Sequence, residues 1–173
     1  MPTSLDAFIR TIPDFPKPGI QFKDITPLLA DPDALRQTAE ALAAPFQDKS
    51  ITKVVGIEAR GFILGPMVAS LLGAGFVPAR KPGKLPAETR SASYALEYGT
   101  DTIEMHADAL TADDVVLIHD DVIATGGTAA AAAQLVAAAG STLVGFSFLV
   151  ELAFLDGRIT LPPETPVASL FTY

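Results

Sequence analysis

The chain contains no cysteine among its 173 residues. It therefore forms no disulfide, offers no thiolate to a metal ion and has no thiol nucleophile. A cysteine-free composition fits a reducing compartment, and we expect the protein to be cytoplasmic. The segment from Met1 to Pro16 carries Asp6 and Arg10 and has no apolar run, so the sequence predicts no signal peptide.

Positive charge is scarce. Twelve Lys and Arg against twenty Asp and Glu give a formal net charge of −8, which argues against nucleic acid or an anionic membrane as a partner held by overall charge. A local basic site remains possible, because four basic residues fall within one Pro- and Gly-containing stretch: Arg80, Lys81, Lys84 and Arg90. A charge run is usually a solvated surface. In an acidic chain, such a concentration in one loop favours anion binding.

Charge is absent altogether from residues 122–150, and hydropathy alone would suggest a membrane span there. The composition changes partway, however. Residues 129–139 are rich in alanine and favour a helix, Gly140 is a typical helix stop, and residues 142–152 are rich in β-branched and aromatic residues. A buried helix followed by a buried strand explains the run, so we expect no membrane partner.

Strands alternate with helices along the chain, which predicts an α/β fold with a mostly parallel sheet flanked by helices, in a single domain over residues 1–173. The predicted helices cover residues 31–47, 61–72 and 129–139, and the predicted strands cover residues 53–58, 76–80, 115–120, 143–149 and 167–171. Residues 91–98 and 102–106 alternate around Gly99 and predict an antiparallel hairpin. Residues 14–26 predict irregular structure, because Pro16, Pro18 and Gly19 interrupt any period.

The strongest motif is VVLIHDDVIATGGT, residues 115–128. An apolar strand leads into Asp120 and Asp121, then into a loop of small residues and a helix. The loop residues are Ala124, Thr125, Gly126, Gly127 and Thr128. Glycines allow close backbone approach, and free N–H groups at a helix start bind anions. The two acids could hold vicinal hydroxyls of a sugar. The loop is neither a Walker A nor a G-x-G-x-x-G motif; TGGT alone could equally be an ordinary strand-to-helix turn.

The full pattern resembles the motif that binds phosphoribosyl diphosphate (PRPP) in type I phosphoribosyltransferases. Further segments resemble the adenine phosphoribosyltransferase family in order and spacing: DFPKPGIQFKDITP from Asp14, GIEARGF around Arg60, RKPGKLP from Arg80 and LEYG from Leu96. The resemblance covers about residues 15–156. It implies the type I phosphoribosyltransferase fold with a hood at about residues 13–27 and a lid loop at about residues 80–98.

The resemblance implies a purine salvage enzyme that transfers 5-phosphoribosyl from PRPP to adenine, giving AMP and diphosphate. It also implies Mg²⁺ bound mainly through PRPP, diphosphate and water, with no direct protein ligand, and a homodimer. Residues 124–128 would bind the 5-phosphate and Asp120 and Asp121 the ribose. The diphosphate would be bound by Arg60, Arg80, Lys81 and Lys84.

The same resemblance implies an adenine site formed by Ile20, Gln21, Phe22, Lys23 and Val122. Phe22 would stack on the purine, and the Gln21 backbone would match the base's N1 and amino group. The catalytic residues would be Arg60 and Glu97, with Glu97 handling the purine proton and Tyr98 lying in the lid. Two residues depart from the family: Lys23 replaces the usual Arg, and His119 replaces an apolar residue. We expect His119 to be partly buried and hydrogen-bonded.

Alternatives remain open. The base could be a 6-oxopurine such as xanthine or hypoxanthine, or the chain could be a non-catalytic PRPP-sensing regulator. A sensor is expected to lack the lid or Glu97 and to carry a DNA-binding domain. This chain has both the lid sequence and Glu97, and we expect no second domain. Individual residues also have simpler interpretations: a local ion pair for Arg60, a core position for Phe22 and an outward-facing strand carboxylate for Glu97.

Overall fold

The computed structural model describes residues 4–95 and 99–173 in two compact units, Met1–Ala41 and Leu42–Tyr173. The first unit contains a 3-10 turn η1 (Leu5–Phe8), β1 (Arg10–Pro13), β2 (Gln21–Asp24), α1 (Thr26–Ala30) and most of α2 (Pro32–Ala43). β1 and β2 pair as an antiparallel hairpin. The prediction of irregular structure over residues 14–26 is therefore wrong for β2. The Pro and Gly signals mark the connection, and four-residue strands are too short to show an alternating pattern.

α2 begins as predicted, because the Asp31 carboxylate accepts hydrogen bonds from the N–H groups of Asp33 (3.0 Å) and Ala34 (2.8 Å). It ends earlier than the predicted residue 47. Pro45 lacks an N–H group and disfavours the α conformation in the residue before it. The chain continues there as a 3-10 turn, η2 (Ala44–Phe46).

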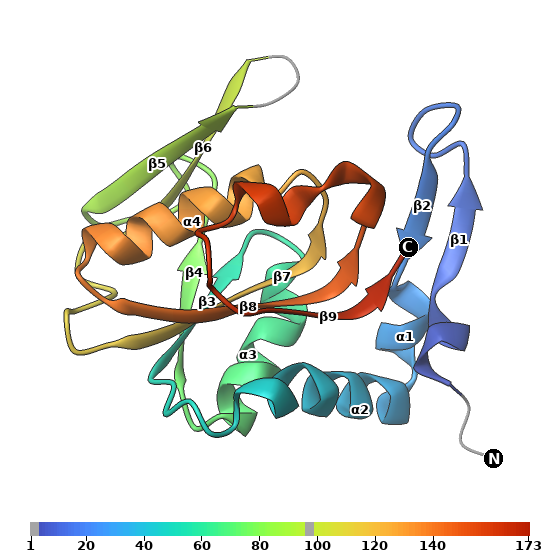
Figure 1. Cartoon of the computed structure of the whole chain (residues 1–173), viewed down its shortest axis with the longest axis horizontal. Helices are drawn as coiled ribbons and strands as arrows, with labels where there is room; N and C mark the ends of the chain where they lie inside the picture. Colours follow the sequence, from blue (N-terminus) through green and yellow to red (C-terminus); the bar gives the residue numbers. More distant parts are fainter. Residues whose placement is uncertain (1–3, 96–98) are drawn as a thin grey trace. The chain divides into compact units, whose positions relative to one another are not determined.

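The second unit is built on a five-stranded parallel sheet in the order β4-β3-β7-β8-β9, which confirms the predicted fold class (Figure 1). Its strands are β3 (Lys53–Ile57), β4 (Gly75–Ala79), β7 (Val115–Ile123), β8 (Thr142–Glu151) and β9 (Val167–Thr172). The hairpin of β5 (Thr89–Ala95) and β6 (Thr100–His106) is also confirmed. Two 3-10 turns, η3 (Ala153–Leu155) and η4 (Gly157–Thr160), precede β9. No helix in the described ranges is long and apolar enough to cross a membrane.

The order in which successive strands are added to the sheet reverses between β3 and β7, and this reversal fixes where a ligand can bind. From β3 the chain crosses through α3 (Gly61–Leu71) to β4 on one side, and from β7 through α4 (Gly127–Ala138) to β8 on the other. Right-handed crossovers place α3 and α4 on opposite faces of the sheet, as Figure 1 shows. Ligands of open α/β sheets bind at the carboxyl ends of the strands where this reversal occurs.

The sheet interior is mostly apolar, and His119, in the middle of β7, is its largest fully buried polar side chain. Its neighbours Leu117 and Ile118 are fully buried, and so is His119 itself. Among the described residues, neither ring nitrogen has a hydrogen bond of ordinary geometry. Burial lowers the pKa of His119 to about 4, and the backbone of Ser147 opposes that shift to a smaller extent. The expectation of a partly buried, hydrogen-bonded histidine is therefore corrected: His119 is a neutral core residue.

This burial predicts an acid-sensitive contribution to folding. The unfolded chain binds a proton at His119 near pH 6.5 and the folded chain only near pH 4, so the free energy of unfolding falls as the pH drops through that window, by about 3 kcal/mol. His119→Leu removes this loss. Chemical denaturation at pH 7.5 and pH 4 should show a smaller loss in the variant than in the wild type; equal losses would show that His119 does not remain neutral.

Candidate active site

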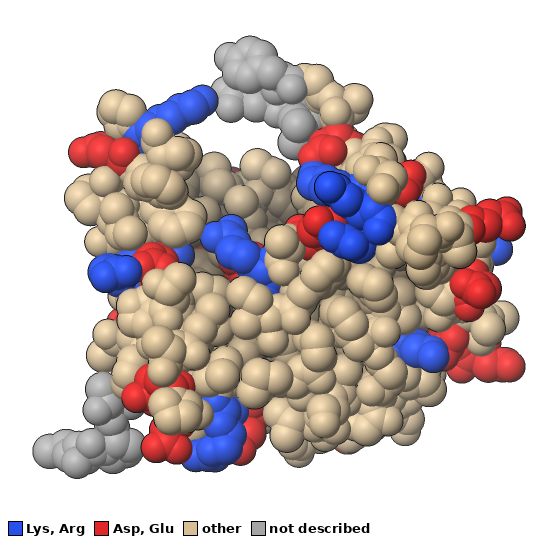
Figure 2. All heavy atoms as spheres, turned by 180° about the vertical axis from the view of Figure 1, so that it is seen from behind, with Lys and Arg blue, Asp and Glu red and all other residues tan. Residues whose placement is uncertain are grey.

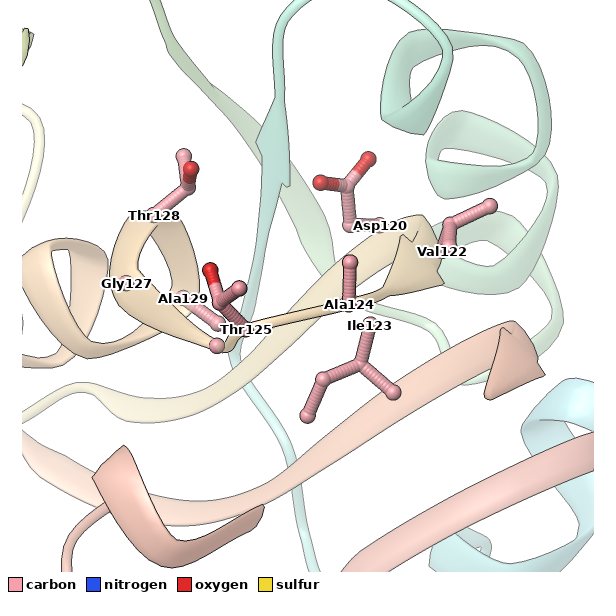
Figure 3. Close-up of a pocket in the computed structure, with 9 residues that line it drawn as sticks. Asp120, Val122, Ile123, Ala124, Thr125, Gly127, Thr128 and Ala129 are labelled. Carbon is pink, nitrogen blue, oxygen red and sulfur yellow. The ribbon is translucent and has the colours of Figure 1, made fainter. Parts of the chain in front are cut away.

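A pocket of about 90 Å³ lies at the carboxyl end of β7, lined by Asp120 and residues 122–129. Figure 3 shows the carboxylate of Asp120 and the hydroxyls of Thr125 and Thr128 on the same side of the loop. The structure thus brings together Val122, the predicted phosphate residues and one of the two predicted ribose residues, Asp120; Asp121 does not line this pocket. Two boundaries differ from prediction: β7 extends to Ile123, so both acids lie within the strand, and α4 begins at Gly127. The last residues of β7 face the pocket and break the apolar pattern that marks a buried strand.

The loop presents an uncapped helix N-terminus to the pocket. Gly126, with a φ of 80°, precedes α4, and no side chain caps the helix. The first N–H groups of an α-helix have no partner within the helix. They carry partial positive charge and bind anions such as phosphate.

Arg60 pairs with one of the two acids near the carboxyl end of β7. The Arg60 Nε lies 2.8 Å from Oδ2 of the buried Asp121, and the Asp121 N–H donates to Asp120 Oδ1 at 2.8 Å. A Cβ on Gly61 would lie only 3.0 Å from the His119 carbonyl oxygen, so the start of α3 is in close contact with β7. The local ion pair considered for Arg60 is therefore present, and its half-exposed side chain remains accessible.

Burial raises the pKa of both carboxyl groups. For Asp120 the neighbouring charge of Asp121 adds to this effect, whereas for Asp121 the Arg60 guanidinium opposes it. Two adjacent buried carboxylates are stabilised by hydrogen-bond donors or nearby positive charge. The vicinal hydroxyls of a ribose supply such donors.

The basic loop predicted from the sequence is paired with carboxylates of the same unit. Arg80 contacts Glu58 through Nε (3.2 Å) and Nη2 (3.1 Å), and the Lys81 N–H donates to Glu58 at 2.8 Å. The Lys81 ammonium pairs with Asp101, and Lys84 is exposed. Figure 2 correspondingly shows Lys and Arg side chains interspersed with acids rather than gathered in one broad patch.

Comparison with known proteins agrees with this geometry. The phosphoribosyl transferase domain family matches residues 24–171. An adenine phosphoribosyltransferase of Synechococcus sp. (strain JA-3-3Ab) is 63% identical over 94% of this chain and 93% of its own, and one from Myxococcus xanthus is 56% identical over 98% and 91%. The chain belongs to the adenine phosphoribosyltransferase family.

Solved structures of this family share the fold. The enzyme of Rhodothermus marinus superposes with a TM-score of 0.93 at 62% identity, covering 98% of this chain and 97% of its own. The enzyme of Saccharomyces cerevisiae, solved with an imino-altritol bisphosphate and adenine, gives a TM-score of 0.90 at 42% identity over 96% of each chain. The predicted type I phosphoribosyltransferase fold is thereby confirmed.

The residues that the family resemblance assigns to adenine, apart from Val122, lie in the first unit, Met1–Ala41. The Phe22 ring is half-buried and meets Phe15 edge to face at 5.1 Å, and Lys23 donates to the Thr11 hydroxyl at 3.0 Å. Gln21 stands opposite Pro13, which has no N–H group to donate to the Gln21 carbonyl. Ile20 is exposed in the connection before β2. Glu97 and Tyr98 lie outside the described residues.

Tyr94, on β5, was missed by the sequence analysis. Its hydroxyl contacts Lys81 Nζ (3.1 Å) and Asp101 (3.0 Å). A Cβ added to Gly127 would lie 3.1 Å from its ring. Tyr94 thus links the phosphate loop to the basic loop of this family member. In the sequence it is one aromatic residue of a short strand, and no local pattern distinguishes it.

The contact with Tyr94 predicts how Gly127→Val would fail. We expect weaker binding of ribose 5-phosphate, because the new side chain meets the Tyr94 ring and displaces the loop. Adding Tyr94→Ala should restore part of that affinity, measured by isothermal titration calorimetry. Tyr94→Ala alone is the control. No recovery in the double variant would mean that the valine occupies the place of the anion itself.

Proposed function

We propose that the protein transfers the 5-phosphoribosyl group of PRPP to adenine, giving AMP and diphosphate, in purine salvage. The observation that carries the proposal is the uncapped helix N-terminus at residues 126–128, which follows shortly after the half-buried Asp120 and the buried Asp121 of β7. A phosphate site beside a site for sugar hydroxyls is what a ribose 5-phosphate group requires. The high identity to adenine phosphoribosyltransferases over nearly the whole chain supports the assignment of the base.

In this mechanism the phosphate loop binds the 5-phosphate while Asp120 and Asp121 accept hydrogen bonds from the ribose hydroxyls. Holding both ends of PRPP aligns the anomeric carbon with the attacking base nitrogen. The charge of the two carboxylates favours positive charge that develops on the ribose as the diphosphate leaves.

Arg60, Arg80, Lys81 and Lys84 would bind the diphosphate. Arg80 already pairs with Glu58, and Lys81 with Asp101. An incoming diphosphate would therefore replace carboxylate oxygens with phosphate oxygens around these two cations. The cost of desolvating Arg80 and Lys81 is reduced, because both side chains are already held near carboxylates. Tyr98 would lie in the lid over this end of PRPP.

Mg²⁺ is proposed to arrive with PRPP, as part of the substrate. The carboxylates of Asp120 and Asp121 fit a nearby Mg²⁺, because its positive charge would oppose the rise in their pKa that burial causes. Within the described ranges, no group of three or more potential ligand side chains gathers around one point. Mg²⁺ usually keeps several waters and takes ligands from substrate phosphates, and it would offset the charge of the leaving diphosphate.

We further propose that two copies associate, with the basic loop completed by the neighbouring subunit. The exposed apolar side chains Ile63 and Leu71 on α3 support an association of this kind.

Base selectivity tests the proposed function. Adenine offers an amino donor and a ring acceptor, which the carbonyl and N–H of the Gln21 backbone match, whereas a 6-oxopurine reverses both. With PRPP and Mg²⁺ we expect AMP from adenine and a kcat/KM on the order of 10⁴-fold lower for hypoxanthine. Comparable efficiency with hypoxanthine would favour the 6-oxopurine enzyme. PRPP binding without product from any base would favour the regulator.

Glu97 is proposed to accept the proton that leaves the purine ring when N9 bonds to the sugar. Glu97→Gln preserves the shape and removes the base, so kcat should fall by at least ~10² while PRPP affinity changes little. Steady-state kinetics and PRPP titration measure the two separately. Glu88→Gln, an exposed acid just before β5, is the control. A near-wild-type kcat would leave positioning and electrostatics as the whole of catalysis.

A further inference from the structure

The phosphate loop is in direct backbone contact with η4. A Cβ placed on Gly126 would fall 2.2 Å from both the Gly157 carbonyl oxygen and the Thr160 hydroxyl. The constraint is reciprocal, because a Cβ on Gly157 would fall 2.2 Å from the Ala124 carbonyl oxygen. No side chain fits between the two segments. The η4 turn is therefore a supporting wall behind the loop.

Thr160 contacts one peptide group of the loop. Its single hydroxyl proton is shared between the Thr125 carbonyl oxygen at 3.1 Å and the Gly157 carbonyl oxygen of its own turn at 2.8 Å. A peptide group is planar, and in the trans form its C=O and N–H point in opposite directions. Because the Thr125 carbonyl is directed at Thr160, the Gly126 N–H is directed away from the wall, to the other side of the loop.

The wall is itself anchored to the sheet. Arg158 pairs with Glu151 at the end of β8 through two contacts of 2.7 and 2.6 Å, and its Nη1 donates to the Val167 carbonyl at 3.3 Å. Glu151 is buried, and Arg158 lowers its pKa. The N–H of Leu152 donates to the Ile123 carbonyl at 3.0 Å. The turn is thus held against both neighbouring strands and can resist displacement of the loop.

We propose that Thr160 is a positioning residue for the 5-phosphate of PRPP. It does not touch the phosphate; through the Thr125 carbonyl it holds the Gly126 N–H in the direction that the anion requires. The inference rests on the proposed function for the identity of the phosphate, and on the contacts of η4 for the residue that acts. Other residues that position the anion belong to the loop or α4, whereas Thr160 lies more than thirty residues further along the chain.

Thr160→Val tests this role, because it nearly preserves the side-chain volume and removes the hydroxyl proton that the Thr125 carbonyl accepts. We expect the KM for PRPP and the dissociation constant for ribose 5-phosphate to rise about tenfold, the magnitude of one lost hydrogen bond to a positioned carbonyl. The KM for adenine, kcat and the thermal midpoint should stay near wild type. Thr160→Ser should restore PRPP binding, and Thr172→Val, exposed at the end of β9, is the matched control.

Unchanged ribose 5-phosphate affinity in Thr160→Val would overturn the inference. So would equal losses for PRPP and adenine with a lowered thermal midpoint, since Thr160 would then only stabilise the fold. Gly157→Ala, which forces a contact with the loop backbone, should abolish phosphate binding if it folds. Failure of the wild type to form AMP would refute the proposed function alone, because ribose 5-phosphate binding is measured without adenine.

Discussion

Two adjacent carboxylates buried at the end of the central strand impose the main constraint on this structure. Asp120 and Asp121 follow four buried residues of β7, and burial alone raises the pKa of each. Removing charge from water is costly unless partners are close. Arg60 supplies one partner, and it can do so because Gly61 lets the start of α3 approach the backbone of β7. The glycine is required for proximity, and the proximity is required for the ion pair.

In the proposed function the same region also binds anions, in a chain with a net charge of −8. Overall electrostatics oppose this, so attraction has to come from groups that act over a few ångströms. Helix N–H groups at Gly127 and Thr128 and the guanidinium of Arg60 are such groups, and salt screening affects buried or close contacts less than distant ones. Recognition in this molecule therefore depends on local geometry, which explains why the loop is supported so closely from behind.

The elements that could be predicted from the sequence are those with a local signal. Continuous apolar runs identified β3, β7 and β8, the Asp31-Pro32 pair identified the start of α2, and Gly99 identified the β5–β6 hairpin. The strand–acid–glycine pattern predicted a loop with an uncapped helix N-terminus, and residues 124–128 form such a loop beside the pocket. Each of these depends on residues that are close together in the sequence.

The features that could not be predicted depend on contacts between distant residues. Thr160 and Tyr94 carry no local pattern, and their contacts with the loop come from where the fold places η4 and β5. His119 was misjudged because a histidine in an apolar strand usually has a hydrogen-bond partner. It is instead fully buried, with its ring close to Gly65 of α3. The β2 strand was missed because its partner, β1, supplies the pairing that its own four residues cannot signal.

The ion pair of Lys81 with Asp101 connects the basic loop to the phosphate loop through Tyr94. Lys81 is held by Asp101 and Tyr94, and the Tyr94 ring lies where a side chain on Gly127 would have to go. Gly127 is the first residue of the helix whose N–H groups face the pocket. An anion that draws Lys81 away from Asp101 therefore removes a contact of the residue that packs on the phosphate loop. A single aromatic side chain, Tyr94, thus contacts the basic loop and packs beside Gly127, and the absence of a Cβ at Gly127 lets that side chain approach.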